Sequence, residues 1–183
     1  MADVSVRPAR AGDAEEIARI QVLAWRTGYA RLVPREVLDA LDEESIAGAW
    51  RQAVTSPPTG RHRVMVAQEG DWTVGFSAFG PADRDEERVE PDAAAIQTLL
   101  VEPRWGRRGH GSRLLNAAAD LLREDGAGTV LVWVPENDTR TRAFYESAGW
   151  EPDGAVRSLD VGGKLVREVR LHTALGASDE AGG

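Results

Sequence analysis

The sequence contains no cysteine. This absence excludes disulfide bonds, thiolate metal sites and cysteine nucleophiles, and it suits a reducing cytoplasm. No apolar run approaches the roughly 20 residues that a membrane-spanning helix needs. Residues 1–20 also lack an apolar segment preceded by positive charge, which is the pattern of a secretory signal peptide. From these absences we expect a soluble, cytoplasmic protein.

Positive charge is scarce in the chain as a whole. The 22 Lys and Arg residues face 30 Asp and Glu residues, which gives a formal net charge of −8. Such a balance argues against general binding to nucleic acid, which requires a broad positive surface. The exception is VEPRWGRRGHGSRLL, residues 101–115, where four arginines and three glycines lie between two apolar runs. In an acidic chain this local charge favours a site for one small anion.

The hydrophobic patterns predict one domain over residues 1–175 and a polar, disordered tail over residues 176–183. The expected strands cover residues 4–9, 62–69, 72–80, 94–101 and 127–134, followed by a hairpin within 155–173. The expected helices cover residues 13–25, 34–41, 43–54, 111–125 and 137–150, the first with a capping box between Asp13 and Glu16. The strands at 94–101 and 127–134 are almost wholly apolar, which indicates burial on both faces. This order predicts a mixed α/β (α+β) fold with a partly parallel centre.

The glycine-arginine turn at 106–111 ends one buried strand and opens a helix. The first turn of a helix leaves backbone N–H groups without partners, and the helix dipole adds about half a positive charge there. Gly109 and Gly111 let a ligand approach the backbone, and neighbouring arginines complete a phosphate site. The alternative is a tight turn with solvated arginines. The turn lacks the Gly-Lys-Ser/Thr of a P-loop, and its glycine spacing reverses the Rossmann fingerprint, so both nucleotide motifs are excluded.

The segment LLVEPRWGRRGHGSRLL resembles the acetyl-CoA loop of the GCN5-related N-acetyltransferases, Gln/Arg-x-x-Gly-x-Gly/Ala. Gly109 and Gly111 match its glycines, whereas Gly106 stands where the family usually has Gln or Arg. The segment VPENDTRTRAFYESAGWEPDG resembles the second half of the family's cofactor site. VRPARAGDAEEIARIQVLAWRTGY resembles its first strand and helix pair, so the resemblance covers about residues 3–173.

The resemblance implies a central mixed sheet of about seven strands, flanked by helices and splayed between the fourth and fifth strands. It also implies acetyl-CoA as cosubstrate, without a metal. The diphosphate would lie on the backbone N–H groups of residues 107–112, with Arg104 as a further phosphate candidate, and the pantetheine arm along residues 99–101. The cofactor-binding residues expected on this basis are Leu99, Val101, Arg107, Arg108, Gly109, His110, Gly111, Ser112 and Asn137. Asn137 has an alternative role as a helix cap.

The resemblance also assigns Tyr145 as the general acid that protonates the departing thiolate, with Phe144 packed in the core. A phenol keeps its proton at neutral pH, although Tyr145 could instead serve only in packing. At the position where many relatives carry a catalytic glutamate, this chain has Ala95. The remaining candidates for the base are Glu90, Asp92 and a water wire that ends at Glu102.

The implied reaction is acetyl transfer from acetyl-CoA to a primary amine on a small molecule or peptide. The acidic segment 83–92 is interpreted as a solvated loop; the alternative is that it borders the acceptor cleft and attracts a cationic amine. Two other functions stay open: a CoA-binding or sensor module with weak catalysis, and an interaction protein that uses its six tryptophans. Members of the family often dimerise, so the resemblance admits a homodimer.

Overall fold

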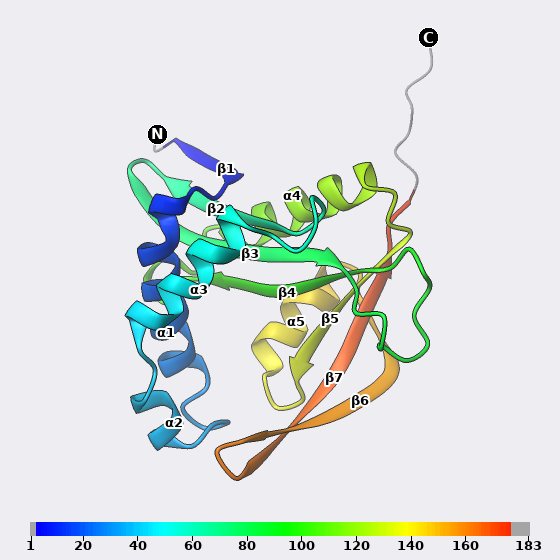
Figure 1. Ribbon diagram of the computed structural model, residues 1–183. Coiled ribbons are helices and arrows are strands. Elements are labelled where there is room, and N and C mark those ends of the chain that lie inside the picture. Colours follow the sequence, from blue (N-terminus) through cyan, green and yellow to red (C-terminus); the bar gives the residue numbers. More distant parts are fainter. Residues whose placement is uncertain (1–2, 177–183) are drawn as a thin grey trace.

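Seven strands form one mixed sheet in the order β1-β2-β3-β4-β5-β7-β6, as Figure 1 shows for the computed structural model, which describes residues 3–176. The strands are β1 (Val4–Pro8), β2 (Arg63–Glu69), β3 (Trp72–Pro81), β4 (Ala94–Val101), β5 (Thr129–Pro135), β6 (Glu151–Val161) and β7 (Lys164–Ala174). The helices are α1 (Ala14–Gly28), α2 (Arg35–Asp39), α3 (Glu43–Thr55), α4 (His110–Glu124) and α5 (Thr139–Ser147), with 3-10 turns η1 (Ala11–Asp13) and η2 (Pro103–Trp105). The predicted mixed α/β fold is confirmed. Apart from Gly176, the predicted tail lies outside the described residues.

The helices cover the sheet on both faces because each has one apolar side. On one face, Leu114 and Ala118 of α4 pack into the same buried cluster as Val74 and Ile96 of the sheet. On the other face, Ile17 and Ile20 of α1 pack with Val66 and Phe76. No helix within residues 3–176 has both the length and the apolar character that crossing a membrane requires.

Strands β4 and β5 separate after a short parallel contact. They pair only from Ala94 with Val130 to Ile96 with Val132. On its other side, β4 shifts register against β3, because Phe79 pairs with Ile96 while Ala78 pairs with Thr98. Gln97 is therefore the extra residue of a β-bulge, which bends its strand and ends regular pairing. The expected splay is confirmed, and it leaves the β5 side of residues 99–101 without a neighbouring strand.

The start of the first helix differs from the prediction. Asp13 precedes α1, but its side chain does not cap that helix. The Asp13 carboxylate instead accepts a hydrogen bond from the Arg10 N–H at 2.7 Å and pairs with Arg7 at 2.8 Å. The hydrogen bond from the Arg7 guanidinium lowers the pKa of Asp13. The predicted capping box with Glu16 is wrong, because the Asp13 carboxylate is hydrogen-bonded to the residue that precedes η1 and does not reach the N–H groups of α1.

The tip of the β6–β7 hairpin lies against α2 and the end of the α1–α2 connection. Gly162 and Gly163 form the turn with φ values of +60° and +86°. A Cβ added to Gly162 would overlap the Val37 side chain, whereas one on Gly163 would enter open space. Lys164 also donates a hydrogen bond to the Arg31 carbonyl at 3.1 Å. These contacts tie the C-terminal hairpin to the N-terminal helices.

We predict that Gly162→Ala destabilises the protein more than Gly163→Ala. Both variants place a side chain in the left-handed region, at a cost of about 1 kcal/mol. Gly162→Ala adds the overlap with Val37, which raises its total cost to about 2–4 kcal/mol. Urea unfolding of both variants measures the difference in the free energy of unfolding. Equal losses would show that the hairpin tip does not press on α2.

Candidate functional site

Two cavities lie along the gap between β4 and β5. The first, here called the loop cavity, has a volume of 410 Å³ and is bordered by the glycine-arginine turn, the start of α4 and α5. The second, here called the sheet cavity, has a volume of 510 Å³ and is bordered by β4, β5, the α1–α2 segment and the β6–β7 hairpin. The residues that line both are Tyr29, Leu99, Leu100, Thr141 and Tyr145. The two cavities therefore meet at these side chains.

The glycine-arginine turn presents the start of α4 to the loop cavity. Gly109 precedes the helix in the left-handed region, with φ at +82°, and Arg107 also has a positive φ, at +65°. His110, Gly111 and Ser112 form the first turn of α4 and line the cavity. Since the N–H groups of a first helical turn have no intrahelical acceptors, this end of α4 is suited to an anion.

Most arginines of the turn hold the loop itself in place. Arg108 pairs with Glu69 at 3.2 Å and lies over the Trp105 ring at 4.9 Å. Arg104 pairs with Glu102 at 2.5 Å and lies over the rings of Trp72 and Trp105, at 5.4 and 5.6 Å. Neither guanidinium lines either cavity. The phosphate contact predicted for Arg104 and Arg108 therefore has no support in this arrangement.

Two other arginines supply the positive charge of the loop cavity. Arg107 lines it from the turn, and Arg140 lines it from the first turn of α5. Sequence reasoning missed Arg140, although NDTRTR places it two residues after Asp138. Its position near the turn depends on how α5 packs, which no local pattern reveals.

His110 fixes the beginning of α4 to the β2–β3 hairpin. Its side chain is buried, and its Nε2 lies 2.7 Å from the Glu69 Oε2. Glu69 thus holds both His110 and Arg108, so one carboxylate anchors the turn from two directions. The Nδ1 of His110 is buried and has no hydrogen-bond partner among residues 3–176. His110 is therefore packed in the structure and also lines the loop cavity.

The structure brings together most of the residues predicted to bind the cofactor. Leu99, Val101, Arg107, Gly109, His110, Gly111 and Ser112 all line the loop cavity, whereas Arg108 and Asn137 do not. Asn137 is exposed, and the neighbouring Asp138 caps α5 by accepting a hydrogen bond from the Thr141 N–H at 3.1 Å. Asp138 lines the cavity instead. The alternative prediction of Asn137 as the helix cap is wrong, because the cap of α5 is the next residue.

Tyr145 lies where the two cavities join. It is 2% exposed, and its ring packs against Phe144 and Trp150 at centroid distances of 5.1 and 4.9 Å. Burial raises the pKa of Tyr145, so its hydroxyl holds a proton more firmly than a free phenol does. Phe144, expected in the core, is the less buried of the pair and lines the loop cavity only.

A second tyrosine, Tyr29, also lines both cavities. It directly follows α1, and burial, with smaller contributions from Asp138 and Glu168, raises its pKa to about 12. Sequence reasoning missed Tyr29 because only the packing of α1 against the open edge of β4 brings it to the site.

The acids proposed as bases lie elsewhere. Glu90 and Asp92 are exposed, and neither lines a cavity. Glu102 is buried, but Arg19 at 2.9 Å and Arg104 at 2.5 Å neutralise it outside both cavities. Ala95 does line the sheet cavity and offers it only a methyl group. The acidic residues that line this cavity are Asp83, Glu86 and Glu168.

The acidic loop is only partly the solvated segment that we predicted. Several of its acids are exposed, but Asp83 and Glu86 line the sheet cavity. The Glu86 side chain is 13% exposed and accepts a hydrogen bond from the Trp133 Nε1 at 2.7 Å. This placement favours the alternative, in which the loop borders a cleft.

Known proteins were compared with the chain in sequence and in fold. The Acetyltransferase (GNAT) family matches residues 20–150. The uncharacterized N-acetyltransferase YuaI of Bacillus subtilis is 30% identical over 92% of this chain and 91% of its own length. The probable N-acetyltransferase Rv2775 of Mycobacterium tuberculosis is 25% identical over 91% and 96%.

Solved structures show the same fold at low identity. The PaiA N-acetyltransferase of Thermoplasma acidophilum, in complex with coenzyme A, has a TM-score of 0.68 and 15% identity, covering 91% of this chain and 98% of its own. YncA of Salmonella typhimurium, a putative acetyltransferase with its cofactor acetyl-CoA, has a TM-score of 0.69 and 18% identity, covering 98% and 96%. With the family match over most of the chain and YuaI aligned over nearly its full length, the protein belongs to the GCN5-related N-acetyltransferase (GNAT) family of acyltransferases.

Proposed function

We propose that the protein transfers the acetyl group of acetyl-CoA directly to a primary amine, with Tyr145 as general acid. The observation that carries the proposal is the meeting of the two cavities at this buried tyrosine. The loop cavity has the donors that a diphosphate needs, and the sheet cavity gives an acceptor access from the opposite side. Tyr145 stands between them, where a thioester and an amine would approach each other.

The loop cavity suits acetyl-CoA in charge and in backbone geometry. The first turn of α4 offers N–H groups, and Arg107 and Arg140 supply positive charge for the diphosphate. Among residues 3–176, no strand pairs with residues 99–101 on their β5 side, so their backbone can pair with an extended chain such as the pantetheine arm. When bound, acetyl-CoA supplies an activated acetyl group as a thioester.

With both substrates in place, acetyl transfer requires that the amine lie beside the thioester and that protons move as the bonds change. The amine nitrogen attacks the thioester carbonyl carbon, the C–N bond forms and the C–S bond breaks. The hydroxyl of Tyr145 gives its proton to the departing sulfur, the nitrogen releases one proton to solvent, and Tyr145 takes a proton back from solvent. Because burial raises the pKa of Tyr145, the hydroxyl remains protonated until that transfer.

Thiol release from acetyl-CoA, measured across a panel of primary amines, tests the proposal. Amine-dependent release supports direct transfer. Acetyl-CoA binding without release by any amine would instead support a CoA-binding module. Failure of acetyl-CoA to raise the thermal unfolding temperature would overturn the cofactor assignment.

We predict that Tyr145→Phe lowers kcat about 100-fold, because it removes the proton donor while keeping the ring. The Kd for acetyl-CoA should stay within about threefold, since the ring still fills the junction of the cavities. Stopped-flow thiol release and calorimetry measure the two quantities. Tyr29→Phe is the matched variant: if it alone slows turnover, the acid role belongs to Tyr29.

Gly111→Val should weaken acetyl-CoA binding about tenfold or more. A Cβ on Gly111 would lie 3.3 Å from the Phe144 ring, which lines the loop cavity. A branched side chain therefore displaces that ring into the cavity, at a cost of about 1–3 kcal/mol. Calorimetry of Gly111→Val, alone and with Phe144→Ala, measures the effect. The added Phe144→Ala should restore part of the affinity; wild-type affinity in the single variant would contradict the prediction.

Arg107→Ala should weaken acetyl-CoA binding about tenfold at low ionic strength, and added salt should reduce the difference. Its neighbour provides the comparison, because Arg108 pairs with Glu69 and lies outside the loop cavity. We expect Arg108→Ala to have the smaller effect. Calorimetric titrations at two salt concentrations compare them, and a larger loss for Arg108→Ala would show that the phosphates meet Arg108.

A further inference from the structure

The sheet cavity is mainly apolar at the end lined by the α1–α2 segment and the β6–β7 hairpin. Leu32, Val33 and Val37 of the α1–α2 segment line it from one side. Leu159 and Val166 of the β6–β7 hairpin line it from the other. Gly162, in the turn of the hairpin, lies close to Val37 of α2, so the two sides of the cavity are in contact there. A ligand in this cavity therefore gains most by presenting an apolar body.

The charges on the cavity lining favour a cation over an anion. Three acidic residues, Asp83, Glu86 and Glu168, line the cavity together with one basic residue, Arg157. Glu168 already neutralises the Arg157 guanidinium through an ion pair of 2.6 Å. A negatively charged acceptor would meet an excess of like charge, whereas an ammonium group would be attracted.

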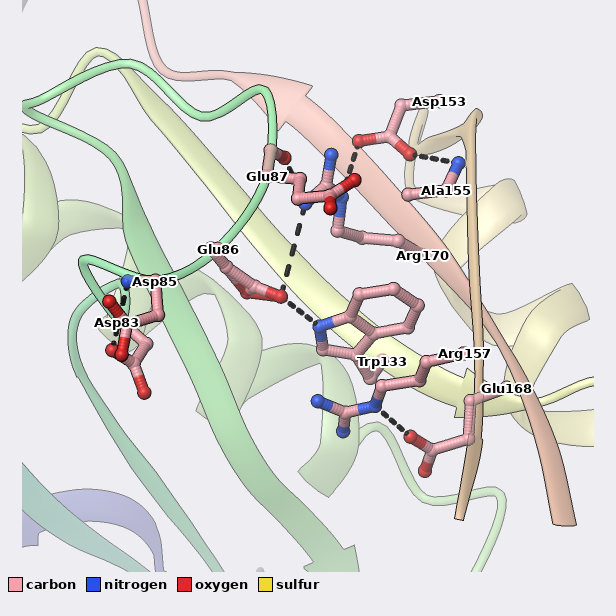
Figure 2. Close-up of polar contacts among 10 residues, drawn as sticks. All are labelled: Asp83, Asp85, Glu86, Glu87, Trp133, Asp153, Ala155, Arg157, Glu168 and Arg170. Atoms are coloured by element: carbon pink, nitrogen blue, oxygen red, sulfur yellow. Dashed lines mark hydrogen bonds and ion pairs between the residues drawn. The ribbon is translucent and has the colours of Figure 1, made fainter. Parts of the chain in front are cut away.

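Glu86 is a carboxylate of the lining that a hydrogen bond from an indole holds in place. Figure 2 shows its side chain reaching from the β3–β4 loop to the Trp133 indole, while Asp83 and Asp85 lie apart from this cluster. Its Oε1 accepts the Trp133 N–H at 2.7 Å and lies 3.9 Å from the Arg170 Nη1. Its Oε2 has no hydrogen bond within the described part of the chain. One oxygen is thus anchored and the other is available to a ligand.

The indole that positions Glu86 is itself fixed from both sides. The Arg157 and Arg170 guanidinium groups lie over its ring at 4.4 and 5.5 Å (Figure 2). Arg170 is 3% exposed and is held by Asp153 at 2.6 Å and by the Glu87 carbonyl at 2.9 Å. The charged groups packed around Glu86 are therefore already engaged with other partners, apart from the long contact of Arg170.

The position of Trp133 brings Glu86 to the point where the sheet opens. Trp133 follows Val132, the last β5 residue paired with β4. Gln97, the bulge residue, and Ala95 line the same cavity on the β4 side. Glu86 thus lines the same cavity as Ala95, the position at which the chain itself has no carboxylate.

Building on the proposed acetyl transfer, we infer that Glu86 binds the ammonium group of an acceptor with an apolar body and accepts its proton. The ammonium gives one proton to the Glu86 carboxylate and becomes a neutral amine, which attacks the thioester carbonyl. As the C–N bond forms and the C–S bond breaks, the nitrogen loses its second proton to water and the sulfur takes the Tyr145 proton. Glu86 then returns its proton to solvent, and Tyr145 takes one back from solvent.

The test uses two acceptors of equal length that differ in charge at pH 8. 2-Phenylethylamine is an ammonium ion at this pH, and benzylhydrazine is mainly neutral. Glu86→Gln keeps an acceptor for the Trp133 N–H but loses the charge and the basic oxygen. We expect this variant to lower kcat/KM for 2-phenylethylamine about 100-fold and for benzylhydrazine less than about fivefold. Equal losses on both acceptors would reject the proton-accepting role.

Glu87→Gln is the matched control. It makes the same change at the next residue, where only the backbone carbonyl contacts Arg170 and the side chain lines neither cavity. We expect wild-type rates on both acceptors. A loss equal to that of Glu86→Gln would assign the effect to the charge of the loop as a whole and overturn the specific role of Glu86.

The wild-type protein tests the acceptor class separately. 2-Phenylethylamine should react faster than spermidine, which lacks an apolar body, and faster than phenylalanine, which adds a carboxylate. Faster reaction of either competitor would reject the inferred class while leaving acetyl transfer intact. If no amine reacts, saturation-transfer NMR with the acetyl-CoA complex decides: absence of 2-phenylethylamine binding overturns the inference, and absence of acetyl-CoA binding overturns the proposed function as well.

Discussion

The separation of β4 from β5 is the constraint on which the rest of the site depends. A single extra residue, Gln97, interrupts the register of β4 against β3 just where its parallel pairing with β5 ends. Beyond that point the backbone of β4 keeps one hydrogen-bonding edge open inside the protein. Unpaired backbone in a protein interior is costly, so the gap is stable only in a fold that provides cavities beside it. Both cavities lie along this gap.

The turn between β4 and α4 shows how charge is divided between structure and binding. An acidic chain gathers arginines there, but ion pairs and indole rings occupy Arg104 and Arg108. These contacts bind the turn to the β2–β3 hairpin, and Glu69 reinforces them through His110. A loop held in this way can keep the start of α4 fixed in one orientation. Preorganised donors bind an anion better because less ordering is required when it arrives.

At the sheet cavity, charged side chains are likewise divided between those that hold the structure and those that a ligand can meet. The Trp133 ring packs against Arg157 and Arg170, and its N–H donates a hydrogen bond to Glu86 of the acidic loop. This hydrogen bond holds Glu86 at the lining of the sheet cavity. The ion pair of Arg157 with Glu168 and that of Arg170 with Asp153 leave little positive charge for a ligand. The balance of charge on the lining is therefore set by ion pairs between the two strands of the β6–β7 hairpin.

The sequence by itself determined the order of elements, the apolar central strands and the glycine turn, because these depend on local periodicity and on residues such as Gly109. The resemblance in its motifs indicated the family, which the comparisons then showed. Only the tertiary structure decided which charged side chains face a cavity. Arg108 and Glu102 looked available but are paired, whereas Tyr29, Arg140 and Glu86 reach the site through the packing of distant elements. A charge is free or neutralised according to its neighbours in space, and spacing along the chain does not carry that information.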